Sequence, residues 1–193
     1  MKKFIIGLLF IILIFGLLCA CAKPPREEME KAHDAVTRAE NDADTVMYAS
    51  GTLVRARDAL TRMQNEADAK RYDAAKTYAA EAITQAERAI FEGRSGASRA
   101  KDEASTLISS LVGPLAETGS ALDAAWRTEK LQIDFASLTS DMEAARRNFN
   151  DAQLSLQSSR YRDAISQGQT VRSLLSGINA ALTESVIAVS RKK

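Results

Sequence analysis

The sequence is poor in the residues that most often carry chemistry. Its 193 residues include one histidine, two cysteines, one tryptophan and three prolines, and aromatic residues make up only 6%. A single histidine, His33, cannot by itself build a metal site or a serine triad, and no glycine-rich phosphate loop or dinucleotide fingerprint occurs. The sequence therefore predicts no catalytic residues, no metal site and no cofactor, and it favours a protein that is not an enzyme.

An excess of either charge is also missing. The chain carries 26 Lys plus Arg and 25 Asp plus Glu, which gives a formal net charge of +1. Loss of residues 1–20 would remove Lys2 and Lys3 and leave +1 − 2 = −1. Such a chain has no overall positive field to attract phosphates, so nucleic acid is not expected among its partners.

The first twenty residues have the pattern of an export signal. Lys2 and Lys3 are followed by an uncharged apolar run from Phe4 to Leu18. This run is shorter than the roughly 20 residues that span a bilayer, and a short apolar run behind a basic start is typical of a signal peptide. We expect residues 1–20 to be a signal peptide that is removed from the mature protein.

Both cysteines stand at the end of this run, in Leu18-Cys19-Ala20-Cys21. The stretch resembles the lipobox of bacterial lipoproteins, in which a leucine at −3 and a small residue at −1 precede the lipidated cysteine. Cys21 fits that pattern, whereas Cys19 would have Gly16 at −3 and Leu18 at −1. The resemblance implies that Cys21 carries a diacylglyceryl group and that Cys19 leaves with the signal peptide. Two alternatives stay open: an uncleaved anchor helix, and a disulfide between the cysteines, although residues i and i+2 have poor geometry for one.

The lipobox resemblance also implies where the protein is attached. Two or three acyl chains hold a protein to a bilayer almost permanently, because each buried CH₂ contributes about 0.8 kcal/mol. By the sorting rule of bacteria with two membranes, Ala22 after Cys21 implies the outer membrane, with the protein on its periplasmic face. In a source with a single membrane, the same signal implies the outer face of the cell membrane. Residues 21–25 would then be the lipidated cysteine and a stiff proline spacer.

Beyond this spacer, composition and periodicity predict helix alone. Alanine is the commonest residue, and apolar residues recur at alternating three- and four-residue steps. We expect residues 26–193 to form one all-α domain, an elongated antiparallel helical bundle of about five helices with an alanine-rich, coiled-coil-like seam. The expected helices cover residues 26–49, 52–68 and 71–112, a long stretch that includes Leu122 to Ala152, and residues 160–189, with Gly113-Pro114 ending the third.

Two stretches that lie 145 − 56 = 89 residues apart resemble each other. The matching pairs are Ala56-Arg57-x-x-Leu60 with Ala145-Arg146-x-x-Phe149, and Arg71-Tyr72-x-x-Ala75 with Arg160-Tyr161-x-x-Ala164. Both copies span a helix end, a polar turn and a helix start, which predicts two related helical hairpins. Chance similarity in an alanine- and arginine-rich sequence is the alternative explanation.

The first copy lies in a longer region that is similar to a known family. Residues 24–90 resemble an uncharacterised alanine-rich helical domain of bacterial envelope lipoproteins, which is sometimes joined to OmpA-like peptidoglycan-binding domains. The shared features are the proline after the lipobox, the progression from Ala39 through Tyr48 to Leu53, and the helix start at Arg71-Tyr72-x-x-Ala75. The family brings no known active site, and this sequence shows no OmpA-like domain, so peptidoglycan binding is not carried over.

Charge is scarce in two stretches of the C-terminal half. Between residues 104 and 126 only Glu117 and Asp123 are charged, and between residues 173 and 190 only Glu184 is. Wide apolar faces inside a bundle of three helices explain such stretches. The alternative is a surface for a protein partner or a lipid, and its candidate residues are Leu107, Leu111, Leu115, Leu122, Trp126 and Ile178. Trp126 is also expected to anchor packing at a helix crossing.

Together these features favour a lipid-anchored envelope lipoprotein with a structural or protein-interaction role and an envelope protein as partner. The first alternative is a module that binds a lipid or other apolar ligand in a cavity between the helices, lined by the four leucines above and Ile178. The second is an enzyme that acts on the cell wall, but no convergent polar cluster supports it.

Overall fold

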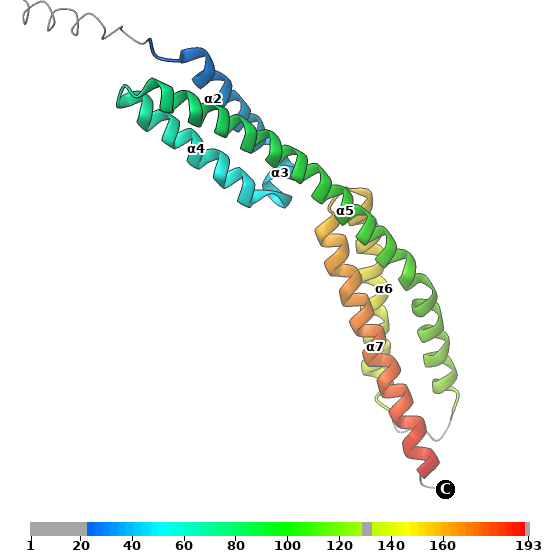
Figure 1. The fold of residues 1–193 in the computed structure, drawn as a ribbon. Coiled ribbons are helices and arrows are strands. Elements are labelled where there is room, and N and C mark those ends of the chain that lie inside the picture. Colours follow the sequence, from blue (N-terminus) through cyan, green and yellow to red (C-terminus); the bar gives the residue numbers. More distant parts are fainter. Residues whose placement is uncertain (1–22, 129–132, 192–193) are drawn as a thin grey trace, which may run out of the picture. The chain divides into compact units, whose positions relative to one another are not determined.

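A computed structural model of the protein describes residues 23–128 and 133–191 (Figure 1). Every regular element in these two ranges is an α-helix, which confirms the all-α prediction. The helices are α2 (Arg26–Asn41), α3 (Ala43–Tyr48), α4 (Ser50–Asp68), α5 (Tyr72–Trp126), α6 (Phe135–Gln157) and α7 (Tyr161–Arg191). The predicted signal peptide and Cys21 lie outside the described residues.

The helix expected over residues 26–49 is divided in two at Asp42. Asp42 has an extended backbone, with φ −84° and ψ 112°, and its carboxylate accepts a 2.7 Å hydrogen bond from the backbone N–H of Thr45. An aspartate that bonds the N–H three residues ahead is a helix N-cap, so it ends α2 and starts α3. α4 then begins at Ser50 rather than after Gly51.

The predicted helix end at Gly113-Pro114 is wrong. α5 continues through Pro114 to Trp126, and the fourth predicted helix is accordingly replaced by the end of α5 and by α6. A proline inside a helix costs about 3 kcal/mol, because it lacks an N–H and clashes with the carbonyl four residues earlier. Buried residues both before and after Pro114, such as Leu111 and Leu122, offset this cost by packing into one core.

The chain divides after Arg94 into two compact units, here called unit 1 (up to Arg94) and unit 2 (from Ser95). Unit 1 contains α2, α3, α4 and the first part of α5, and its core is made mostly of alanine. The buried residues of that core are Ala32, Ala35, Val36, Ala39, Ala49, Leu53, Ala56, Ala59, Met63, Ala79, Ala82, Ala86 and Ala89. Because alanine side chains are short, the helix axes can approach closely along this seam.

Unit 2 contains the rest of α5 with α6 and α7, and its core holds larger side chains. The buried residues are Ala104, Leu107, Ile108, Leu111, Leu122, Leu138, Met142, Ala145, Phe149, Ala152, Ala164, Val171, Leu175, Ile178 and Leu182. Positions 89 residues apart are buried in both units, for example Leu53 and Met142. The two units therefore bury the same positions of the repeat with side chains of different size.

The two predicted hairpins also share one turn geometry. Lys70 and Ser159 both have φ 59°, in the left-handed region. The backbone N–H of Arg71 donates to the carbonyl of Glu66 at 2.8 Å, and the N–H of Arg160 donates to the carbonyl of Ser155 at 2.8 Å. These bonds and a left-handed residue make a Schellman motif at the end of α4 and of α6. The matching geometry supports two related hairpins over chance similarity.

Glycine at the left-handed position is expected to stabilise each turn. A residue with a Cβ pays about 1–2 kcal/mol there, while glycine pays about 0.5–1 kcal/mol in chain entropy. Ser159→Gly should therefore raise the free energy of unfolding by about 0.5–1 kcal/mol, measured by urea denaturation. Ser158→Gly is the matched control, since Ser158 has φ −87° and should gain nothing. A lower unfolding free energy for Ser159→Gly than for the native chain would contradict this account.

Candidate functional site

The described chain begins two residues after the predicted lipidation position, Cys21. Lys23, Pro24 and Pro25 precede α2, and the carbonyl of Pro25 accepts a 3.0 Å hydrogen bond from the N–H of Met29 in the first turn. Proline before a helix fits this arrangement, because the missing N–H has no partner at a helix start in any case. The first helix therefore starts 26 − 21 = 5 residues after Cys21.

The six residues predicted to form a partner or ligand surface do not lie together on the surface. Four of them are buried in the core of unit 2, and Leu115 packs partly buried against that core. The four buried residues, with exposed fractions of 7%, 3%, 7% and 1%, are Leu107, Leu111, Leu122 and Ile178. These four side chains belong to one buried cluster, so they are core residues and give no support to a ligand cavity between them.

Trp126 is the exception among the six. It is the last residue of α5 and is 68% exposed, so the prediction of a buried anchor at a helix crossing is wrong. Its ring meets that of Phe135 edge to face, with 5.0 Å between the ring centres and an interplanar angle of 77°. This contact joins the last residue of α5 to the first residue of α6.

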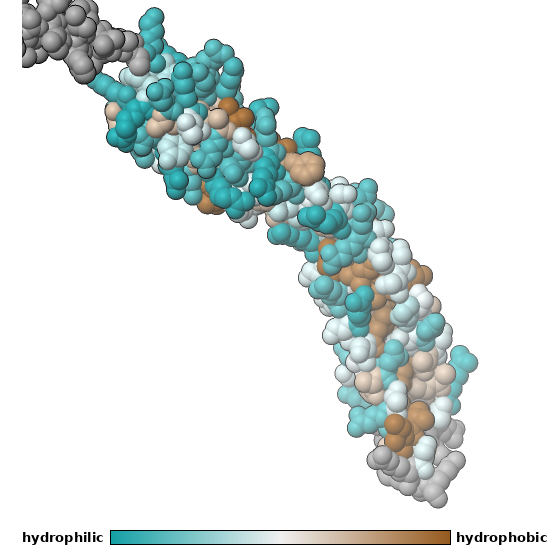
Figure 2. Space-filling model, viewed as in Figure 1, coloured by the Kyte–Doolittle hydropathy of each residue, from teal (hydrophilic) through white to brown (hydrophobic). Residues whose placement is uncertain are grey.

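Unit 2 instead has an apolar groove between α5 and α7 that sequence analysis did not identify. The groove has a volume of about 650 Å³. It is lined by Ala121, Ala124, Ala125, Thr128, Asn179, Leu182, Thr183, Val186, Ile187, Val189 and Ser190. None of these residues is charged, and in Figure 2 hydrophobic surface is more extensive over unit 2 than over the mainly hydrophilic unit 1.

A polar contact holds the two walls of this groove together. The side-chain amide of Asn179 on α7 donates a 2.9 Å hydrogen bond to the hydroxyl of Thr118 on α5. Thr118 is only 2% exposed. Asn179 is exposed, but the buried hydroxyl of Thr118 would lose this partner if α5 and α7 moved apart, so the bond links the two helices near the groove.

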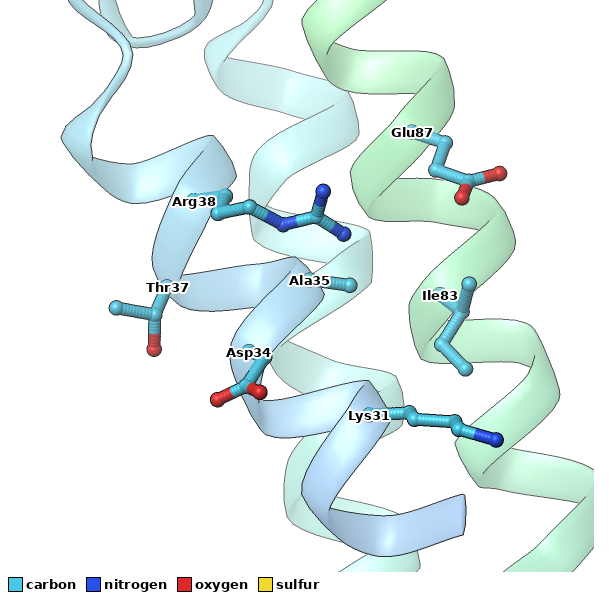
Figure 3. Close-up of a pocket in the computed structure, with 7 residues that line it drawn as sticks. All are labelled: Lys31, Asp34, Ala35, Thr37, Arg38, Ile83 and Glu87. Atoms are coloured by element: carbon cyan, nitrogen blue, oxygen red, sulfur yellow. The ribbon is translucent and has the colours of Figure 1, made fainter. Parts of the chain in front are cut away.

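A groove of unit 1 has the opposite character (Figure 3). It lies between α2 and α5, with a volume of about 510 Å³. Its lining residues are Lys31, Asp34, Ala35, Thr37, Arg38, Ile83 and Glu87. Figure 3 shows the long side chains of Lys31 and Arg38 reaching from α2 toward α5, where Ile83 and Glu87 stand. Charges of both signs surround a small apolar floor, which is typical of a solvated helix surface.

The carboxylates with shifted pKa values are all held in their charged form. The hydroxyl of Thr52 donates to Glu92 at 2.5 Å and Nε of Arg88 donates at 2.7 Å, and these bonds lower the pKa of Glu92. Hydrogen bonds from Arg71 lower the pKa of Glu66 in the same way. These hydrogen bonds therefore stabilise the charged form of both carboxylates.

Stability should depend on pH through Glu92. Because the folded-state pKa of Glu92 is lowered from 4.5, its contribution is fully present above pH 4.5 and is lost as the pH falls through the folded-state pKa. Glu92→Gln should therefore destabilise the chain most at neutral pH, with a difference from the native chain that shrinks on acidification. Urea unfolding of both chains between pH 7 and pH 3 measures this, and a constant difference would contradict the assignment.

His33 is exposed, and its Nδ1 lies 3.2 Å from the hydroxyl of Thr37. Within residues 23–128 and 133–191 there is no group of three or more His, Cys, Asp or Glu side chains that could hold a metal ion.

One helix of the described chain, α7, is long and apolar enough to cross a membrane. The segment runs from Tyr161 to Ser190, and 22% of its most apolar 18 residues are buried. Core helices of soluble proteins also pass this test. α7 is apolar on more than its core face. Val171, Leu175 and Ile178 are buried in the core of unit 2, whereas Val186 and Ile187 are 55% and 46% exposed.

Comparison of the chain with curated proteins and with solved structures gives no match. The family comparison does: residues 27–105 match the family described as "Domain of unknown function (DUF4398)". The matched region contains α3 and α4, all of α2 except Arg26, and α5 up to Ser105. This agrees with the resemblance of residues 24–90 to an uncharacterised helical domain.

Proposed function

We propose that the protein is a lipid-anchored envelope lipoprotein with a non-enzymatic structural or protein-interaction role on the periplasmic face of the outer membrane. The observation that carries the proposal is the sequence Leu18-Cys19-Ala20-Cys21 behind a basic start and an apolar run. The order of lipidated cysteine, proline spacer and helical bundle supports it, because α2 begins directly after Pro25.

The surfaces of the two units support an interaction role. The carboxylates with lowered pKa values, Glu27, Glu66 and Glu92, accept hydrogen bonds from neighbouring Lys, Arg or Thr side chains. Unit 1 offers charged helix faces and unit 2 an uncharged groove. Two surfaces of different chemistry on one anchored chain suit binding to other components of the envelope.

An apolar ligand in a cavity among the four leucines and Ile178, the alternative drawn from the sequence, gains no support. Those residues pack in the core of unit 2 or against it. The apolar groove between α5 and α7 is open at the surface and shares none of them.

Analysis of the native protein tests the proposed function directly. Mass spectrometry of the N-terminal peptide should find Cys21 at the new N-terminus, with the mass of a diacylglyceryl group added. Density-gradient separation of envelope membranes should place the protein in the outer-membrane fraction, and protease should reach it only after the outer membrane is opened. An unmodified N-terminus on a water-soluble protein would refute the proposal.

A further inference from the structure

The short helix α3 buries a single side chain. Among its six residues only Thr45 is buried, whereas Val46 and Met47 are 50% and 47% exposed. The backbone leaves the helical conformation on both sides of α3, at Asp42 (φ −84°, ψ 112°) and at Ala49 (φ −132°, ψ 28°). The segment from residue 42 to residue 49, here called the strap, therefore has little apolar burial to hold it closed.

The one buried side chain of the strap lacks a polar partner. Thr45 is 0% exposed, and its hydroxyl has no hydrogen-bond partner among the described residues. Thr52 on α4 is also buried, but its hydroxyl donates to Glu92 at 2.5 Å and accepts from Arg55 at 2.7 Å. A buried hydroxyl without a partner has lost the hydrogen bonds that it makes in water. Opening of the strap would restore them for Thr45.

The strap covers the backbone of α5 at Gly93. A Cβ at this position would stand 2.7 Å from the Cα and the backbone N of Thr45. Because glycine has no side chain, no apolar side chain of α5 takes part in the contact at this point. Little apolar surface is therefore exposed there when the strap moves away.

The helices on either side of the strap have contacts of their own. Nε of Arg57 on α4 donates to Glu40 of α2 at 2.6 Å, and Thr52 in the first turn of α4 donates to Glu92 of α5. α2, α4 and α5 also bury their own residues in the core of unit 1, and this burial contributes more than the exposed ion pair. These three helices therefore stay joined without the strap.

We propose that the strap opens by itself, while α2, α4 and α5 stay packed, and that its opening uncovers the backbone of α5 at Gly93. Opening breaks the cap between Asp42 and the N–H of Thr45, so the closed strap is the populated state. What separates the strap from its neighbours is that opening returns a buried hydroxyl to water and exposes few apolar side chains.

Hydrogen exchange of the native state, measured by NMR, tests the proposal. The chain used runs from Lys23 to Lys193 and contains every described helix. The N–H groups of Thr45, Val46 and Ala49 are hydrogen-bonded within the strap and report its opening. We expect them to exchange at least about tenfold faster than the amides in the middle of α4, and independently of low urea concentrations, because local opening exposes little surface.

Thr45→Val tests the cause of the opening. Valine has nearly the shape of threonine and lacks the hydroxyl, so the closed strap no longer holds an unpaired polar group. Exchange of the strap amides should become about tenfold slower, while exchange in unit 2 stays unchanged. Thr52→Val is the matched control, since it removes a hydroxyl that is hydrogen-bonded to Glu92 and Arg55, and it should slow exchange nowhere.

Two results would overturn the proposal. If the strap amides exchange as slowly as those of α4 and with the same urea dependence, the strap opens only when the whole of unit 1 unfolds. If Thr45→Val leaves exchange in the strap unchanged or speeds it, the buried hydroxyl is not what favours opening. Because the tested chain lacks Cys21, neither result bears on lipidation.

Discussion

Cys21→Ala is expected to abolish lipidation and to leave the protein as an unprocessed precursor in the cell. In the lipobox to which Leu18-Cys19-Ala20-Cys21 is similar, the cysteine sulfur is the atom that receives the diacylglyceryl group. Alanine has no such atom, so no thioether can form and cleavage before position 21 should fail. Labelling of cells with a palmitate analogue should give no signal for this variant, and its mobility in gel electrophoresis should be that of the precursor.

Cys19→Ala is the matched control for this experiment. It changes the other cysteine two residues away and leaves Leu18, Ala20 and Cys21 in place. It should be labelled, processed and fractionated like the native protein. Loss of labelling in Cys19→Ala with full labelling in Cys21→Ala would reverse the assignment, and a disulfide between the cysteines would make both variants behave alike.

The expected effect on location follows from the acyl chains. Two or three chains with about 0.8 kcal/mol for each buried CH₂ bind far more tightly than any exposed side chains of this protein can. The unlipidated chain should therefore leave the outer-membrane fraction.

The helical class could be predicted from periodicity and the two hairpins from the 89-residue repeat, but the course of α5 could not. Gly113-Pro114 is a strong local signal for a helix end. It fails because the residues on both sides of it pack into the same core, with Ile108 and Leu111 before it and Leu122 after it. The free energy of that burial comes from contacts with α6 and α7, which local sequence patterns do not contain.

The two low-charge stretches lie in α5 and α7, the helices that line the apolar groove, but most of the residues predicted for a surface are packed in the core. In α7, Leu175 and Ile178 lie on the core face, whereas Val186 and Ile187 are exposed along the groove. Residues on both faces are apolar, so composition does not tell them apart. Their assignment depends on where α5 lies relative to α7, which only the structure gives. Trp126 was misplaced for a related reason, since α5 ends at this residue instead of continuing.

Gly93 shows how a close approach between helices escapes sequence analysis. In the sequence it stands out only as a helix residue that costs about 1 kcal/mol relative to alanine. In unit 1 the backbone of α3 lies directly against it. A Cβ at position 93 would stand 2.7 Å from the Cα and the backbone N of Thr45, and 2.9 Å from the carbonyl carbon of Asp44. Only glycine lets α3 pack on α5 at this distance.

Gly93→Ala is therefore expected to destabilise unit 1, against the helix preference of alanine. The contacted atoms belong to the backbone of α3, which is held by the Asp42 cap, so they cannot move aside as a flexible side chain could. Overpacking costs about 1–3 kcal/mol or more, and we expect a net loss of about 2 kcal/mol in the free energy of unfolding. Urea denaturation followed by circular dichroism measures it.

Gly177→Ala is the matched control for Gly93→Ala. Gly177 also lies inside a helix, α7, and a Cβ there would meet nothing within 4 Å. With no clash to oppose it, the helix preference of alanine should stabilise this variant by up to about 1 kcal/mol. Changes of opposite sign in the free energy of unfolding for Gly93→Ala and Gly177→Ala would show that the close approach of α3, rather than backbone entropy, requires glycine at position 93. Stabilisation by Gly93→Ala would instead mean that α3 is free to move away from α5, and the packing described for unit 1 would be wrong.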